Sequence, residues 1–185
     1  VVVFARFDLS RPPCHHDRGC CSSCCFFNPS HKIIIFHKKW FLTQNHAFCF
    51  KKWFSKSDLK IALISGRYSS ATEHRAKELK IEDVYNGSLN KLPAYEALKE
   101  KYNLDDSEIA YIGDDLIDIP VMEKVGVPIA VANAAPEVKA ITKYTTKISG
   151  GYGAFREAVA WIIEEKGETD MVMQRMKEKV LNSQE

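Results

Sequence analysis

Three aspartates follow a short apolar run near the middle of the chain, in the string IAYIGDDLIDIPVMEKVG at 109–126. Asp114 and Asp115 come directly after the run, and Asp118 follows at the start of a helical pattern. A buried strand that carries two adjacent carboxylates at its carboxyl end, where open α/β sheets bind ligands, suits a hard divalent cation. We interpret Asp114 and Asp115 as ligands of Mg²⁺ beside a phosphate site. The alternative is an acid-rich helix start, where Asp interacts favourably with the helix dipole.

Two upstream segments carry residue types that bind phosphate. An apolar run at 61–64 ends in Ser65 and Gly66, which offer a hydroxyl and backbone amides able to approach phosphate oxygens closely. Lys91 begins a predicted helix and would neutralise phosphate charge next to a bound cation. Taken singly, Ser65–Gly66 also fits a plain strand-to-helix turn, and Lys91 fits a solvated surface lysine. In this order along a parallel α/β pattern, the three segments together predict one phosphoryl-transfer site.

The elements that must position these residues alternate from Lys56 onward. Short β-branched runs alternate with amphipathic helical patterns, which predicts an α/β fold with a parallel sheet and helices on both of its faces. We expect strands at Ile61–Ser65, Asp83–Tyr85, Ile109–Gly113, Pro128–Val131 and Tyr144–Lys147, and helices at Ser69–Leu79, Leu92–Tyr102, Ile117–Val125, Glu137–Thr142 and Ala154–Glu165. The tail, 168–185, fits a marginal amphipathic helix or a mobile arm.

The composition, 45% hydrophobic and 27% charged residues, is typical of a globular protein. A net charge of +2 gives no indication of nucleic-acid binding. No apolar run reaches the roughly 20 residues that span a bilayer, so no membrane association is expected. The absence of a secretory signal and the reducing habitat of unpaired cysteines favour a cytoplasmic protein.

The first 55 residues have a different composition from the rest. They hold all six cysteines and nine of the ten phenylalanines, but only two acids, Asp8 and Asp17, of the 24 in the chain. Within them, Lys32–Phe36 could form a buried strand and Val1–Phe4 an edge strand. Zinc bound by the cysteine-rich part is one alternative. The other is an out-of-frame or misassigned coding origin, which we favour.

Six motifs after Lys56 resemble one known family. They are ALISGR, Arg75 placed eight residues after Arg67, NKL at 90–92, YIGDDLIDIPVMEKVG, VANAAPEV at 131–138, and GGYGAFRE at 150–157. Residues 57–165 are similar to the haloacid dehalogenase superfamily, and closely to its 3-deoxy-D-manno-octulosonate 8-phosphate phosphatase family. The domain prediction is therefore an anomalous segment at 1–55, a phosphatase core at 56–167 and a tail at 168–185.

This resemblance implies a three-layer Rossmann-like core without a large cap domain, acting in the cytoplasm on a small phosphorylated sugar acid in lipopolysaccharide precursor synthesis. It also implies a homotetramer in which the tail can reach a neighbouring active site. Residue by residue, it assigns phosphate binding to Ser65, Gly66 and Lys91, with Ser65 and Lys91 catalytic. It assigns Mg²⁺ to Asp114 and Asp115, the substrate carboxylate to Arg67 and Arg75, and capping or orientation of the next helix to Asp118.

The first motif of this superfamily, D-x-D-G-V-L-T-D after an apolar strand, is absent from the chain. It would supply the nucleophile and the general acid, so the chain as written is expected to be inactive or impaired. Its sheet would also lack a central strand and would need a substitute such as Lys32–Phe36. Two functional alternatives stay open: a non-catalytic protein that binds phosphate and metal, and a phosphatase for another phosphorylated substrate, such as a different sugar acid or a nucleotide.

Overall fold

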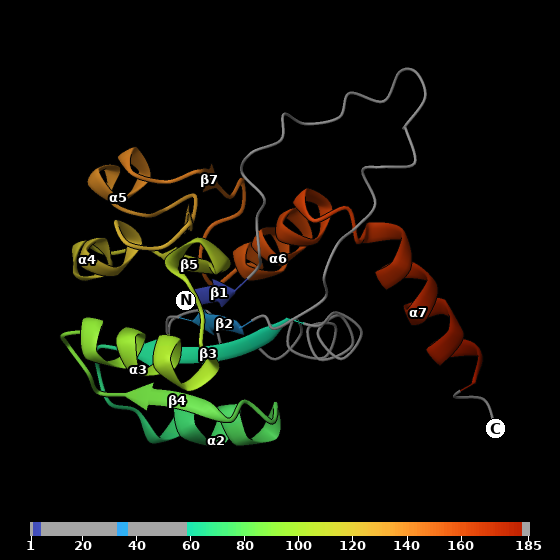
Figure 1. Cartoon of the computed structure of the whole chain (residues 1–185), viewed down its shortest axis with the longest axis horizontal. Helices are drawn as coiled ribbons and strands as arrows, with labels where there is room; N and C mark the ends of the chain where they lie inside the picture. The colour runs from blue at the N-terminus through green and yellow to red at the C-terminus, as the bar shows by residue number, and fades with distance from the viewer. Residues whose placement is uncertain (1, 5–32, 37–58, 183–185) are drawn as a thin grey trace.

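The computed structural model describes residues 2–4, 33–36 and 59–182, and these form a seven-stranded sheet covered by helices (Figure 1). The strand order is β4-β3-β1-β2-β5-β6-β7. The strands are β1 (Val2–Phe4), β2 (Ile33–Phe36), β3 (Lys60–Ser65), β4 (Asp83–Asn86), β5 (Ile109–Gly113), β6 (Val127–Ala130) and β7 (Tyr144–Thr145). All neighbouring pairs among β3 to β7 are parallel, as the alternating pattern predicts.

Two short strands fill the position between β3 and β5. Strand β2 runs parallel to both, with Phe36 opposite Leu63 of β3 and Ile35 opposite Tyr111 of β5. The expected substitute strand is therefore present, and it starts at Ile33. Strand β1 is antiparallel to β2, β3 and β5. The prediction of an edge strand at 1–4 is wrong, because β1 lies inside the sheet, where both of its backbone edges find hydrogen-bonding partners.

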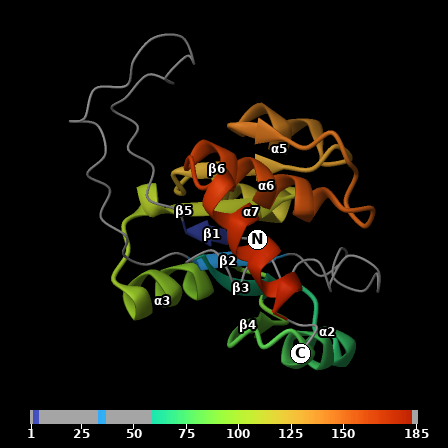
Figure 2. The same cartoon turned by 90° about the vertical axis from the view of Figure 1, so that its right-hand side faces the viewer.

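The helices return the chain from the carboxyl edge of the sheet to its amino edge. They are α2 (Ser70–Glu78), α3 (Leu92–Tyr102), α4 (Ile119–Met122), α5 (Pro136–Ala140), α6 (Ala154–Glu165) and α7 (Thr169–Leu181), with short 3₁₀ turns η2 (Asp106–Glu108) and η3 (Leu116–Asp118). Figure 2 shows α2 and α3 on opposite sides of the strands. This agrees with right-handed crossovers, because the chain moves outward from β3 to β4 and then back to β5.

The core lies on both faces of the sheet. Strand β5 is buried along its whole length, and the middle of β3 is equally inaccessible, so the filled centre leaves neither strand uncovered. Helix α6 covers one face with six buried residues, and α3 packs beside α4. The tail forms helix α7, which extends from the end of α6 (Figure 1) and buries Val172 while leaving Met173 and Leu181 exposed.

Among the predicted elements whose observed bounds differ, two differ for an identifiable reason. The helix expected at 117–125 is a 3₁₀ turn followed by the single turn α4, because Asp115 and Asp118 form a capping box around η3. The last strand, expected at 144–147, ends at Thr145. The backbone amides of Lys147 and Ile148 bond to the Glu157 carboxylate at 2.8 and 2.9 Å instead of to a neighbouring strand.

Candidate active site

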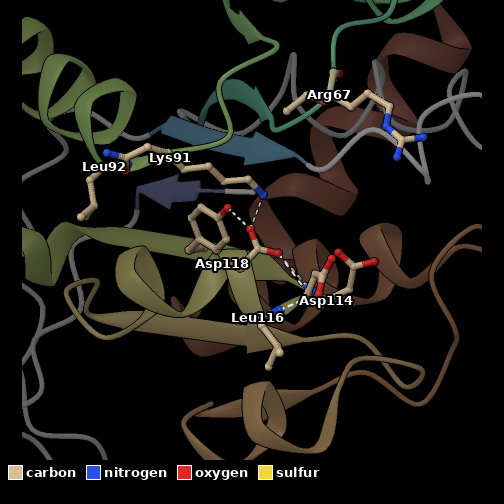
Figure 3. Close-up of polar contacts among 10 residues, drawn as sticks. Arg67, Lys91, Leu92, Asp114, Leu116 and Asp118 are labelled. Atoms are coloured by element: carbon tan, nitrogen blue, oxygen red, sulfur yellow. Dashed lines mark hydrogen bonds and ion pairs between the residues drawn. The ribbon is translucent and has the colours of Figure 1, made fainter.

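The Asp118 carboxylate is the centre of a buried polar network at the carboxyl end of β5 (Figure 3). One oxygen, Oδ1, accepts hydrogen bonds from the ammonium of Lys91 and from the hydroxyl of Tyr111. The other, Oδ2, accepts from the backbone amides of Asp114 at 3.1 Å and Asp115 at 3.2 Å. A single carboxylate thus holds the proposed phosphate lysine and the backbone of both proposed metal ligands in one arrangement.

Electrostatics keeps Asp118 ionised and Tyr111 protonated near neutral pH. Burial opposes ionisation of Asp118, but the Lys91 charge and the hydrogen bonds from Lys91 and Tyr111 outweigh it and lower the pKa of Asp118 to about 2. Burial and the negative charge of Asp118 raise the pKa of Tyr111 well above its usual range. Tyr111 therefore remains a hydrogen-bond donor and Asp118 remains an acceptor.

Lys91 is buried, which contradicts the alternative of a solvated surface lysine. It stands at the N-cap of α3, and only 2% of the residue is exposed. A lysine without a partner is almost never found so deep, because burying an unpaired ammonium costs several kcal/mol of folding free energy. The pairing with Asp118 explains its depth and aims its side chain at the carboxyl edge of β5.

Asp114 and Asp115 differ in surroundings. Asp114 is partly buried, and its carbonyl accepts the amide of Ala135 at 3.0 Å, which ties it to the turn before α5. Asp115 is exposed, and its Oδ1 accepts the amide of Leu116 at 2.7 Å. Asp115 thus serves as the cap of η3, and Asp114 is the better placed of the two to contact a ligand at the edge.

The donor chemistry fits Mg²⁺ better than a metal that needs a complete protein cage. Among residues 2–4, 33–36 and 59–182, no three His, Cys, Asp or Glu side chains converge as a metal site. Mg²⁺ is commonly held by one or two carboxylates, with water and substrate phosphate completing its shell. Asp114, with Asp115 beside it, provides this minimal set of hard oxygen ligands.

The Ser65–Gly66 turn lies against the segment that carries the aspartates. A Cβ added to Gly66 would approach the Cδ1 atom of Ile117, the residue before Asp118, to 3.2 Å. The Ser65 side chain is fully buried, and its hydroxyl donates to the carbonyl of Arg67 at 2.8 Å. The fold therefore brings the predicted phosphate-binding turn against the segment of the predicted metal ligands. A phosphate contact from Ser65 requires its hydroxyl to rotate.

The two arginines assigned to the substrate carboxylate have different environments. Arg67 is exposed in the turn after β3, and Figure 3 draws it apart from the contact between Lys91 and Asp118. Arg75 lies in α2, where it forms an ion pair with Glu78 at 2.5 Å. Arg67 is accordingly the arginine with a guanidinium available to an anionic ligand, whereas Arg75 would have to exchange its present partner.

The nucleophile expected at the end of a central strand has no counterpart in the sequence there. After Phe36, the last residue of β2, the chain continues with His37, Lys38 and Lys39, none of which is a carboxylate. Asp8, one of the two acids in the first 55 residues and so a carboxylate to consider as nucleophile, lies outside the residues that the structure describes. The cysteines that zinc would need lie outside them as well. Within the residues that the structure describes, the predicted phosphate and metal residues therefore stand at the edge of the sheet, and the sequence directly after β2 adds no carboxylate to them.

Tyr111 and the pairing of Lys91 with Asp118 were not predicted from the sequence. A signal does exist in Gly113, which shares a strand face with Tyr111. A Cβ at Gly113 would lie 2.6 Å from the Sδ atom of Met122 and 2.9 Å from the Cβ atom of Asp118. The glycine makes room for the aspartate to return against the strand, but the sequence does not reveal which lysine it meets.

Comparison with known proteins gives a consistent family. A sequence model described as haloacid dehalogenase-like hydrolase matches residues 55–151, which is more than half of the chain. The 3-deoxy-D-manno-octulosonate 8-phosphate phosphatase of Escherichia coli strain K12 is 44% identical over 114 residues, covering 62% of this chain and 61% of that protein. The match thus spans about three fifths of the curated relative.

Solved structures agree in fold over a larger part of the chain. The 3-deoxy-D-manno-octulosonate 8-phosphate phosphatase of Yersinia pestis has a TM-score of 0.69 and 32% identity, covering 75% of this chain and 83% of that one. The enzyme of this name from Moraxella catarrhalis, solved with magnesium, phosphate and KDO, has a TM-score of 0.69 and 26% identity. The alignment covers 77% of this chain and 91% of that one. With its Rossmann-like, largely parallel sheet, this chain belongs to the haloacid dehalogenase-like hydrolase family.

Proposed function

We propose that this protein is built as a magnesium-dependent phosphomonoester hydrolase for 3-deoxy-D-manno-octulosonate 8-phosphate. The observation that carries the proposal is the Asp118 network, which joins a buried lysine to the backbone of Asp114 and Asp115 beside the Ser65–Gly66 turn. A lysine, a carboxylate pair and a strand-end turn are the groups that stabilise a transferring phosphoryl group. The curated and solved relatives of that name support the substrate.

Each residue has a distinct role in this proposal. Lys91 neutralises charge on the phosphoryl oxygens, and Ser65 with the Gly66 amide binds them. Asp114 and Asp115 hold Mg²⁺, which would offset phosphate charge when bound. Arg67 and Arg75 bind the sugar carboxylate, for which a planar guanidinium offers two parallel hydrogen bonds.

Hydrolysis by this family's route needs an attacking carboxylate and a general acid, neither of which follows β2 in the sequence. We therefore expect the chain as written to bind phosphate without efficient turnover. The test measures phosphate release from 3-deoxy-D-manno-octulosonate 8-phosphate with and without Mg²⁺. A version in which residues 37–44 are replaced by D-x-D-G-V-L-T-D is compared with the original chain, and the replacement carrying Asp114→Asn is the matched control.

Magnesium-dependent release in the replacement alone would support the assignment. Equal release by the original chain would mean that another group attacks phosphorus. If the folded replacement releases no phosphate, the phosphatase proposal is wrong and a non-catalytic binding function is favoured.

That second candidate is a non-catalytic protein that binds a phosphorylated ligand, favoured by the absence of a carboxylate directly after Phe36. It predicts magnesium-dependent binding of phosphate esters by the original chain, measurable by calorimetry, and one zinc per chain if the cysteine segment is a structural site. The third alternative, a phosphatase for another phosphorylated sugar acid or a nucleotide, would appear as a different order of preference among phosphate esters.

We also propose that residues 1–55 arose from an error in the coding sequence. The break in composition near residue 55 coincides with the start of the family match at the same residue. Reading the other two frames upstream of the Lys56 codon tests this, and the absence of D-x-D-G from both would contradict it. The homotetramer and the cytoplasmic location also stay predictions. In the part of the chain described structurally, no helix is long and apolar enough to cross a membrane.

A further inference from the structure

The side chain of Asn86, the last residue of β4, bonds to the backbone of a neighbouring turn. Its Oδ1 accepts the amide of Ser69 at 3.1 Å, and its Nδ2 donates to the carbonyl of Ser69 at 2.8 Å. Nδ2 also lies 3.3 Å from the Oε1 atom of Glu73. The Asn86 carboxamide thus forms the same pair of hydrogen bonds with Ser69 that a residue of a neighbouring strand would form. It does so beyond the end of β3, where no strand among the described residues pairs with Ser69.

These bonds close a five-residue turn, Ser65–Ser69, with Arg67 at its middle. At the first end, the carbonyl of Ser65 accepts the backbone amides of Gly87 and Ser88, both at 2.9 Å. At the second end, Ser69 is held by the Asn86 side chain. The two ends of the turn are therefore attached to three consecutive residues, Asn86 at the end of β4 and Gly87 and Ser88 directly after it, and Arg67 lies between these attachments.

The two attachments are chemically independent. Gly87 and Ser88 use backbone amides to hold Ser65, and these do not require the Asn86 side chain. Removing that side chain frees the Ser69 end and the bond to Glu73 of α2, while the Ser65–Gly66 end next to the aspartates keeps its hydrogen bonds. The loss should consequently affect what Arg67 binds more than what Ser65 and Lys91 bind.

We infer that Asn86 is a positioning residue that sets the specificity of the site for a carboxylated phosphate ester by holding Arg67 at the site edge. This inference rests on the proposed function, in which Arg67 binds the substrate carboxylate. Asn86 itself touches no substrate. Its effect passes through the Ser65–Ser69 turn to the guanidinium.

The test measures binding to the full chain in the presence of Mg²⁺, by calorimetry, of two probes: 3-deoxy-D-manno-octulosonate 8-phosphate, and phenyl phosphate, which has no carboxylate. Asn86→Ala should weaken binding of the carboxylated ester by about tenfold and binding of phenyl phosphate by less than about twofold. A loss of affinity of about tenfold corresponds to the loss of one well-aligned charged contact. Asn103→Gly is the control. It removes an asparagine at the C-terminal end of α3, away from the turn. The left-handed backbone of Asn103 suits glycine.

A double-mutant cycle separates positioning from a general structural effect. Arg67→Ala should weaken the carboxylated probe at least as much as Asn86→Ala does, and the double variant should bind no more weakly than Arg67→Ala alone. Additive losses, or equal losses for both probes in Asn86→Ala, would contradict the inference. A wild-type chain with no preference for the carboxylated probe would contradict the proposed function and the role of Asn86 with it, whereas a preference that survives Asn86→Ala would overturn the inference alone.

Discussion

Lys91 and Asp118 form an ion pair in which neither side chain has any solvent-exposed surface. The pair joins the start of α3 to the segment after β5, two parts of the chain separated by 27 residues. Because the same carboxylate also accepts the Asp114 and Asp115 amides, the ion pair connects the start of α3 to the backbone of both proposed metal ligands.

Removing one partner should therefore be costly. Asp118→Asn leaves the Lys91 charge buried without compensation, and we expect a loss of about 3–5 kcal/mol in the free energy of unfolding, measured by urea denaturation. Adding Lys91→Met should recover part of this loss, since the double variant buries no unpaired charge. A double variant less stable than Asp118→Asn would show that the pair is not what makes the single change costly.

Gly113→Ala tests the close approach of Asp118 to β5. The added methyl group would lie 2.6 Å from Met122 Sδ and 2.9 Å from Asp118 Cβ, so Asp118 must move. We expect destabilisation of about 1–3 kcal/mol, typical of overpacking, together with weaker magnesium-dependent phosphate binding. Gly113→Ala combined with Met122→Ala relieves one clash only. Binding should stay weak in this double variant, because Asp118 remains displaced.

Strand β2 is tested by interrupting its hydrogen bonds. Proline at Ile34 or Ile35 removes a backbone donor from a strand that pairs with both β3 and β5, and proline is rarely tolerated in such a position. Both variants should fail to show a cooperative unfolding transition by circular dichroism, whereas Ile34→Val, which keeps the backbone donor and the β-branched side chain, should retain it. Normal folding of both proline variants would mean that β2 is dispensable to the sheet.

The turn after β7 should loosen at low pH. Burial opposes ionisation of Glu157, but hydrogen bonds from the Lys147 and Ile148 amides and from Tyr144 lower its pKa below the usual 4.5. A carboxyl group whose pKa is lowered on folding stabilises the native state above its unfolded pKa and loses that effect as pH falls toward the folded value. The stability difference between wild type and Glu157→Gln should shrink below about pH 4.5, and an unchanged difference would contradict this role.

Several elements could be predicted because their signals are local. The strand Ile109–Gly113 and the helices Leu92–Tyr102 and Ala154–Glu165 have the predicted bounds, since their apolar periodicity matches the faces that they bury. The helix expected at 117–125 was too long, because the capping box formed by Asp115 and Asp118 favours a 3₁₀ turn there. The strand expected to reach Lys147 was too long because Glu157, ten residues later, takes its amide.

By itself, the sequence determined which residues stand at the carboxyl ends of the parallel strands, because a strand's end and the residues after it are adjacent along the chain. Ser65, Gly66, Asp114 and Asp115 were placed at one edge in this way. Only the tertiary structure decided that Asp118 meets Lys91 and Tyr111, and that β1 joins the expected substitute strand β2 at the centre of the sheet. Such contacts depend on which segments pack together in space, and pairing across long stretches of chain leaves no periodic pattern in the sequence.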